Sequence, residues 1–167
     1  MFTIDRASIF WSYLSPGQKG LIETGVYLYE DLQKHPDLRI TDYSYLVFPF
    51  AKAYEGFLKQ LFVDLKFISR EKFESDSFRI GKALNPSLEK RMRGESVYDK
   101  LVAHSGDPRL ADKLWEMWKQ GRNLLFHYFP HNLKAITLPE AETVIEDMIN
   151  LIETTVTETN VIAAVKS

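Results

Sequence analysis

The stretch DYSYLVFPFAKAYEGFLKQLFVDL, residues 42–65, carries the strongest helical pattern of the chain. Its large apolar side chains recur at spacings of three and four residues, which places them on one stripe of a helix. This stripe consists of Leu46, Phe50, Ala53, Tyr54, Phe57, Leu58, Leu61 and Leu65. Pro49 interrupts the pattern, and a proline inside a helix costs roughly 3 kcal/mol, so it either kinks the helix or marks its first turn. The stretch predicts a long core helix.

The N-terminal part of the chain predicts a second helix. Ser15 followed by Pro16 is typical of a helix start, and an apolar pattern continues to the stop at His35-Pro36. We therefore expect a helix near 16–33. The preceding segment, residues 9–14, is too apolar to be left exposed. We expect it to pack against the bundle or against a second subunit.

Two further helices are predicted near the C-terminus. Asp107 followed by Pro108 marks a start, and an apolar stripe continues from there into the polar motif of residues 122–131. Thr137 and Glu140 fit a capping box, and apolar side chains follow at helical spacing to Val156. Both segments are long enough to contribute a face to a core.

Residues 68–104 lack a clear period and contain several turn signals, so we expect an irregular connection with one short helix near 96–104. No stretch shows the alternation of a β-strand. The prediction is an all-α fold, a four-helix up-and-down bundle with additional short helices. The 167 residues suit a single domain, with a core over about 42–156 and an N-terminal helical extension over 1–40.

Composition excludes several classes of site. The chain has no cysteine, which removes disulfides, thiol nucleophiles and cysteine-based metal centres. It shows no signal-like N-terminus and no apolar run that could cross a membrane, so we expect a soluble, cytoplasmic protein. The formal net charge is −2, and any contact with nucleic acid must therefore be local. The densest basic run, around Lys90, Arg91 and Arg93, is either a solvated turn or a phosphate contact.

Polar chemistry is concentrated in RNLLFHYFPH, residues 122–131. On a helical wheel Arg122 shares a stripe with four aromatic side chains, namely Trp115, Trp118, Phe126 and Phe129. An arginine there finds an anion, stacks on the aromatic rings or borders a cleft. The ordinary alternative is that it pairs with a carboxylate or reaches water with its head. His127 points about 140° away from Arg122 on a straight helix, whereas Asn123 and His127 share a face.

Three arrangements would bring Arg122 and His127 to one site. The arginine can reach around the helix, Gly121 can let the helix deform, or two copies of the helix can face each other. His127 and His131 are four residues apart, which suits a metal on a continuous helix. Pro130 disfavours helical geometry between them, so we predict neither a metal site nor a cofactor.

Together these residues resemble the HEPN superfamily. The resemblance rests on Arg122-Asn123 followed by His127 in a late helix, and on a final helix that opens with LPEAE, residues 138–142. It covers roughly residues 42–156. Within the superfamily, AKAYEGFLK, residues 51–59, is similar to the catalytic domain of RnlA-type (RNase LS) toxins. One departure is that HepT-type relatives carry a tyrosine two residues after the histidine, where this chain has Phe129.

The resemblance implies a metal-independent endoribonuclease, a toxin or antiviral effector that works as a homodimer and is restrained by a cognate antitoxin or regulatory protein. RNA would be cut by attack of its own 2′-hydroxyl, leaving a 2′,3′-cyclic phosphate. His127 would transfer protons, Arg122 would bind the phosphate and Asn123 would orient the histidine or the scissile group. The alternative is a non-catalytic HEPN-like dimerisation module that binds RNA or protein.

The resemblance also makes Glu55 a possible partner of Arg122 or His127. The ordinary explanation is a solvated row of ion pairs, because Lys52, Glu55 and Lys59 lie at spacings of three and four on the polar side of the helix. We further expect substrate contacts from the basic or imidazole side chains outside the catalytic set, namely Lys52, Arg91, Arg93 and His131.

Overall fold

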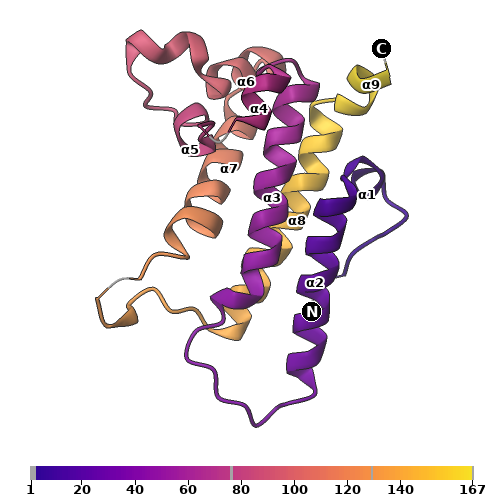
Figure 1. Cartoon of the computed structure of the whole chain (residues 1–167), viewed down its shortest axis with the longest axis vertical. Helices are drawn as coiled ribbons and strands as arrows, with labels where there is room; N and C mark the ends of the chain where they lie inside the picture. The colour runs from indigo at the N-terminus through magenta and orange to yellow at the C-terminus, as the bar shows by residue number, and fades with distance from the viewer. Residues whose placement is uncertain (1–2, 76, 129, 167) are drawn as a thin grey trace.

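The computed structural model describes residues 3–75, 77–128 and 130–166, and within these ranges it contains helices, turns and loops but no strand. The all-α prediction is therefore confirmed. Three long helices lie side by side (Figure 1): α2 (Pro16–Gln33), α3 (Ser44–Asp64) and α8 (Leu138–Glu158). A fourth, α7 (Arg109–Trp118), lies on the other side of α3. Helices α2 and α7 run in one direction and α3 and α8 in the other.

Helix α3 is the centre of the core, as its apolar stripe predicts. Phe50, Tyr54, Phe57 and Leu61 are each at most 1% exposed. Pro49 is also buried and lies inside the helix, more than one turn beyond Ser44. The alternative in which this proline marks the first turn is therefore wrong. The packing of α3 against α2 and α8 offsets the hydrogen bond that the proline cannot donate.

The predicted start signals of α2 and α8 are confirmed as capping boxes. The side chain of Ser15 accepts a hydrogen bond from the backbone of Gln18, and the Gln18 side chain accepts one from the backbone of Ser15. Thr137 and Glu140 make the same reciprocal pair at α8. Each box satisfies backbone donors that the first turn leaves free. Before α7, Asp107 Oδ1 instead accepts from the backbone of Arg109 at 2.7 Å.

The N-terminal segment packs against its own chain. Helix α1 (Ile9–Tyr13) buries Phe10, and Leu14 follows it into the core. The hydroxyl of Tyr13 donates to Asp64 Oδ2 at 2.7 Å, and its carbonyl accepts from Gln60 Nε2 at 3.0 Å. The segment is therefore fixed to the C-terminal half of α3, and the first of the two expectations for it is correct.

The connection between α3 and α7 is more helical than predicted. The expected helix near 96–104 is present as α6 (Val97–Ser105), but α4 (Arg70–Glu74), α5 (Ile80–Ala83) and the 3₁₀ turn η1 (Lys90–Glu95) precede it. Helices of four to six residues are too short to show a period. Buried side chains hold α5 and its flanking turns in place, namely Phe78, Ile80, Ala83, Leu84 and Leu88. The described residues of α4 and η1 include no buried one, and α4 begins at a cap in which the Ser69 side chain accepts from the backbone of Lys72.

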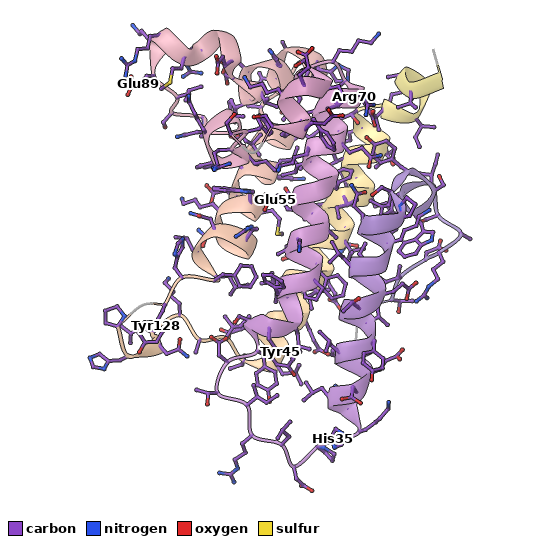
Figure 2. All side chains as sticks on the ribbon, in the orientation of Figure 1. His35, Tyr45, Glu55, Arg70, Glu89 and Tyr128 are labelled. Atoms are coloured by element: carbon purple, nitrogen blue, oxygen red, sulfur yellow. The ribbon has the colours of Figure 1, made fainter. Side chains whose placement is uncertain are left out.

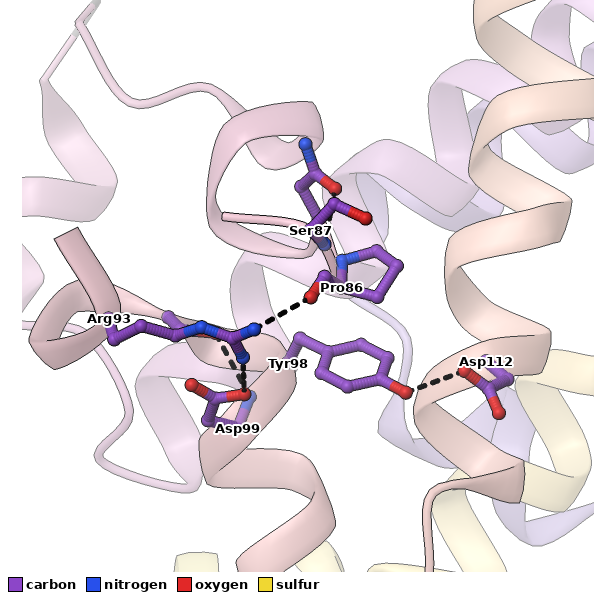
Figure 3. Close-up of polar contacts among 8 residues, drawn as sticks. Pro86, Ser87, Arg93, Tyr98, Asp99 and Asp112 are labelled. Carbon is purple, nitrogen blue, oxygen red and sulfur yellow. Dashed lines mark hydrogen bonds and ion pairs between the residues drawn. The ribbon is translucent and has the colours of Figure 1, made fainter. Parts of the chain in front are cut away.

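Polar contacts brace this connection (Figure 3). The guanidinium of Arg93 donates to Asp99 Oδ1 at 2.6 Å and to the carbonyl of Pro86 at 3.1 Å. The hydroxyl of Tyr98 donates to Asp112 Oδ1 at 2.6 Å, which ties α6 to α7.

The chain after α7 continues through a π-helix, η2 (Lys119–Leu124), and a 3₁₀ turn, η3 (Pro130–Asn132), to α8. A short helix, α9 (Val161–Lys166), follows α8, and its Val161 is fully buried. None of the described helices combines the length and the apolar character that a membrane crossing requires.

Candidate functional site

A groove of about 330 Å³ lies between α3 and the η2 region. Helix α3 contributes one stripe of side chains, and η2 and the turn after it contribute the opposite wall. In Figure 2, Glu55 lies on the side of α3 that faces α7. The lining residues are Phe48, Ala51, Lys52, Glu55, Gly56, Lys59, Arg122 and Phe126. The groove therefore joins the AKAYEGFLK segment to the arginine of the polar motif.

An ion pair crosses this groove. The Nε of Arg122 donates a hydrogen bond to Glu55 Oε2 at 2.9 Å, and both side chains keep access to solvent, at 39% and 30% exposure. Lys59 Nζ lies 3.9 Å from the other carboxylate oxygen of Glu55. Both explanations of Glu55 are thus partly correct, because it pairs with Arg122 and also belongs to an ion-pair row on α3.

The groove carries an excess of positive charge. Lys52, Lys59 and Arg122 contribute three cations and Glu55 one carboxylate, a formal net charge of +2 (three minus one). The whole chain has a net charge of −2. Such a local excess attracts an anion, and the guanidinium fork of Arg122 is suited to phosphate or carboxylate.

Aromatic rings form one end of the groove. The guanidinium carbon of Arg122 lies 6.0 Å from the ring centroid of Phe126, within the range of a cation–π contact. Phe126 packs edge-to-face on Phe48, with ring centroids 5.4 Å apart. Arg122 therefore does lie beside Phe126, as the shared stripe predicts; Phe129, the last member of that stripe, lies outside the described residues.

The position of Arg122 depends on the π-helix η2. After Trp118 the backbone changes to i→i+5 hydrogen bonding, so the prediction of one continuous α-helix through the motif is wrong. Gly121 is buried at the centre of η2. A Cβ atom there would lie 2.9 Å from Met117 Sδ and 3.2 Å from Met148 Cε. The missing side chain lets η2 approach α8 closely. The helix is deformed at Gly121, as in one of the three arrangements considered, but within one chain the deformation does not bring His127 into the groove beside Arg122.

A buried hydrogen bond fixes α7 against α3. The hydroxyl of Tyr54 donates to the carbonyl of Leu114 at 3.0 Å, and Tyr54 is completely buried. Tyr54 precedes Glu55 in the chain, and Leu114 lies two turns before Arg122. This contact therefore sets the register in which the two sides of the groove face each other.

His127 does not line the groove. It lies in a bend after η2, where its backbone N–H donates to Leu124 O at 3.3 Å. Its imidazole is exposed and makes no hydrogen bond with any described residue. Asn123 is half-buried, and among the residues described its side chain also makes no hydrogen bond. Within one chain, Arg122 and Glu55 meet, whereas His127 and Asn123 do not join them.

The other residues predicted to contact the substrate do not lie together in the structure. Lys52 is exposed and lines the groove. His131 is exposed in η3, in a left-handed conformation with φ of 59°. Arg91 pairs with Glu89 at 2.7 Å, and Arg93 braces the connection as described above. Figure 2 shows Glu89 near the upper end of the molecule and Glu55 at its middle. The two arginines therefore lie away from the groove.

Phe48 is the groove residue that sequence reasoning missed. Its position in the sequence could have indicated it. Phe48 lies four residues before Lys52, on the polar side of the helix and off the apolar stripe formed by Leu46, Phe50 and their neighbours. A large apolar side chain on the polar side of a core helix is a candidate contact residue when a second aromatic ring packs on it, as Phe126 does here. It is 51% exposed in the structure.

A larger concavity, of about 470 Å³, lies between η2 and the start of α8. Leu124, Leu125, Ile136 and Val144 make it mainly apolar, and it contains none of the predicted site residues. No cluster of three or more carboxylate or imidazole side chains suited to a metal ion occurs among the described residues.

Comparison of the chain with protein-family models, with curated protein sequences and with solved structures gives no match.

Proposed function

We propose that this chain is an endoribonuclease of the HEPN type that acts as a homodimer and needs no metal ion. The observation that best supports this proposal is the cationic groove. In it, Nε of Arg122, from the polar motif, donates to Oε2 of Glu55, from the toxin-like segment, at 2.9 Å. The up-and-down course of α2, α3, α7 and α8 is compatible with the bundle that the resemblance implies.

The groove supplies the electrostatic part of RNA cleavage. The 2′-oxygen attacks the adjacent phosphorus as its proton passes to a base, and the bond from phosphorus to the 5′-oxygen breaks as that oxygen takes up a proton. Negative charge on the phosphate oxygens builds in the transition state. Arg122, with Lys52 and Lys59 beside it, stabilises that charge. Glu55 holds the guanidinium in position.

The histidine comes from a second copy. His127 is exposed and lies outside the groove of its own chain, but the interface of a symmetric dimer can place a residue of one copy beside a different residue of the other. Imidazole transfers protons efficiently near neutral pH, so His127 serves as general base or acid. A dimer with His127 of one copy beside Arg122 of the other completes the site. Asn123 orients the imidazole or the scissile group.

A ribonuclease of this kind is toxic to the cell that makes it. We therefore assign it to a toxin–antitoxin or antiviral system and expect a cognate protein to restrain it. The exposed His127 and the open groove give such a partner two features to cover.

Incubation of purified protein with single-stranded RNA in EDTA tests the proposal. The wild type should cut and leave 2′,3′-cyclic phosphate ends, and His127→Ala should cut about 10²- to 10⁴-fold more slowly, the usual contribution of a positioned acid or base. His35→Ala is the matched control, since His35 is an exposed histidine in the turn after α2. Intact RNA at every protein concentration, or equal cleavage by His127→Ala, overturns the proposal.

The second candidate is a non-catalytic module that binds RNA or protein. The observation in its favour is that, within one chain, Arg122 is already paired with Glu55 and His127 lies outside the groove. In this case the wild type binds RNA without cutting it, and Arg122→Ala weakens the binding. Arg39→Ala, at an exposed arginine before α3, is the control and should bind RNA like the wild type.

A further inference from the structure

Phe48 exposes part of its aromatic ring beside the cations of the groove. Its side chain is 51% exposed, although it belongs to α3, the helix at the centre of the core. Its ring is supported by Phe126 from the opposite wall, with centroids 5.4 Å apart and planes at 78°. An edge-to-face partner fixes a ring while leaving much of its surface free. The ring is therefore both held in place and accessible.

The cations follow Phe48 along the same face of α3. Lys52 and Lys59 lie four and eleven residues after Phe48, which places all three on one side of the helix. The row extends about 16 Å at about 1.5 Å per residue. At about 3.4 Å per nucleotide of a stacked strand, this is the length of a few nucleotides. An aromatic surface at one end and cations along the rest match a base followed by its phosphates.

We propose that Phe48 is a stacking platform for an unpaired base, so that the groove selects single-stranded RNA over duplex RNA. This inference rests on the proposed function and specifies its substrate class. A base within a duplex is stacked on its neighbours and cannot lie on an exposed ring, whereas every base of a single strand offers a π face. With a net chain charge of −2, non-specific attraction of a phosphate backbone is weak. Stacking on Phe48 supplies the affinity that bulk charge does not.

The occupant is a nucleic acid strand because the groove combines a net charge of +2 with an exposed aromatic ring. An apolar helix of a protein partner would cover three cations, Lys52, Lys59 and Arg122, with Glu55 as their one carboxylate in the lining. The net charge of +2 would then have no counter-charge, which is costly when a groove is covered. A phosphodiester strand satisfies the cations and the ring together.

Binding is tested with a fluorescent 2′-O-methyl oligonucleotide of about twelve nucleotides, within the site sizes known for single-strand grooves. This probe lacks the attacking hydroxyl and stays intact, so anisotropy reports affinity whether or not the chain is a nuclease. Phe48→Ala and Phe48→Leu should both bind it about 5- to 100-fold more weakly, the range of one base–aromatic stack. Phe48→Trp should retain affinity. Tyr27→Ala, at a tyrosine 62% exposed on α2, is the matched control and should be unchanged.

Two further probes test whether Phe48 contacts an unpaired base. An abasic strand of the same length should bind wild type and Phe48→Ala equally, and a duplex of the same sequence should bind more weakly than the single strand. Equal affinity of wild type and Phe48→Leu for the intact single strand overturns the stacking proposal, as does equal binding of duplex and single strand. Tight, Phe48-dependent binding without cleavage of ordinary RNA overturns the proposed ribonuclease but supports the platform.

Discussion

Arg122 and Glu55, separated by 67 residues in the chain, are joined by a hydrogen bond of 2.9 Å from Nε to Oε2 across the groove. Glu55 is the acidic member of the described lining residues. It thus orients the arginine and also competes with an incoming phosphate for it. Removal of its charge should separate these two effects.

Glu55→Gln keeps the shape of the side chain and raises the formal net charge of the groove from +2 to +3. RNA should bind more tightly, and the slope of log affinity against log salt should steepen by about 0.7, the effect of one additional phosphate neutralised on a single strand. The slope is measured by titration of the 2′-O-methyl strand at several salt concentrations. Glu71→Gln, at an exposed glutamate of α4, is the control. An unchanged slope for Glu55→Gln contradicts the assignment of Arg122 to phosphate binding.

Tyr54→Phe removes the buried hydrogen bond to the carbonyl of Leu114 and leaves the ring in place. The free energy of unfolding should fall by about 0.5–1.5 kcal/mol, the net value of one such bond, with more lost if the carbonyl stays dry. Urea unfolding at neutral pH measures the change. Because this contact sets the register of α7 against α3, RNA affinity should fall as well. A variant with unaltered stability would show that the contact does not hold α7 in place.

Alanine substitution at two glycines of α2, Gly25 and Gly20, should have opposite effects on the free energy of unfolding. A Cβ atom at Gly25 would lie 2.3 Å from the ring of Phe50, which is 1% exposed and cannot move away easily. Gly25→Ala should therefore destabilise the protein by about 1–3 kcal/mol. Gly20 has no neighbour within 4 Å of such an atom, so Gly20→Ala should stabilise it by about 0.4–1 kcal/mol. Urea unfolding compares the two variants, and changes of equal sign contradict the α2–α3 packing.

Tyr29 gives the protein a pH-dependent contact at alkaline pH. Burial and then the hydrogen bond to Glu142 raise the pKa of Tyr29 from 10.0 to about 12. The pKa in the folded state is the higher one, so this stabilisation is complete below pH 10 and is lost as the pH rises from 10 through 12.

The difference in unfolding free energy between wild type and Tyr29→Phe should therefore shrink over that range. Urea unfolding at pH values from 9 to 11, within and just below the window from 10 to 12, measures this difference. The raised pKa of Tyr98 is common to both proteins and cancels. Tyr27→Phe, an exposed change on the same helix, should show a constant difference from wild type. A constant difference for Tyr29→Phe as well would contradict the prediction.

The features that could be predicted from the sequence are those set by local rules. The apolar stripe of residues 46–65 predicts α3 because each of its side chains is placed by helical spacing alone. The capping boxes at Ser15 and Thr137 predict the starts of α2 and α8 because the partners lie three residues away. Helices as short as α4 and α5 contain too few residues to show a period, and α5 is held by buried side chains that a local pattern does not reveal.

The candidate site depends on contacts that no local pattern contains. The π-helix at Lys119–Leu124 depends on the close approach of Gly121 to Met148, which is distant in sequence. The meeting of Arg122 with Glu55 depends on the register that Tyr54 sets. The wheel of 100° per residue placed Arg122 beside Phe126. It could not show that Arg122 meets Glu55, nor where His127 lies once the helix changes its hydrogen-bonding period.

The most direct test of the composite site mixes two inactive variants. Arg122→Ala and His127→Ala are each purified, combined in equal amounts under conditions that exchange subunits, and assayed for RNA cleavage in EDTA. If Arg122 of one copy works with His127 of the other, each mixed dimer keeps one intact pair. With half of the dimers mixed, the rate should recover to about a quarter of the wild-type rate. A mixture no more active than its separate components, alongside an active wild type, would contradict the claim that two copies build the site.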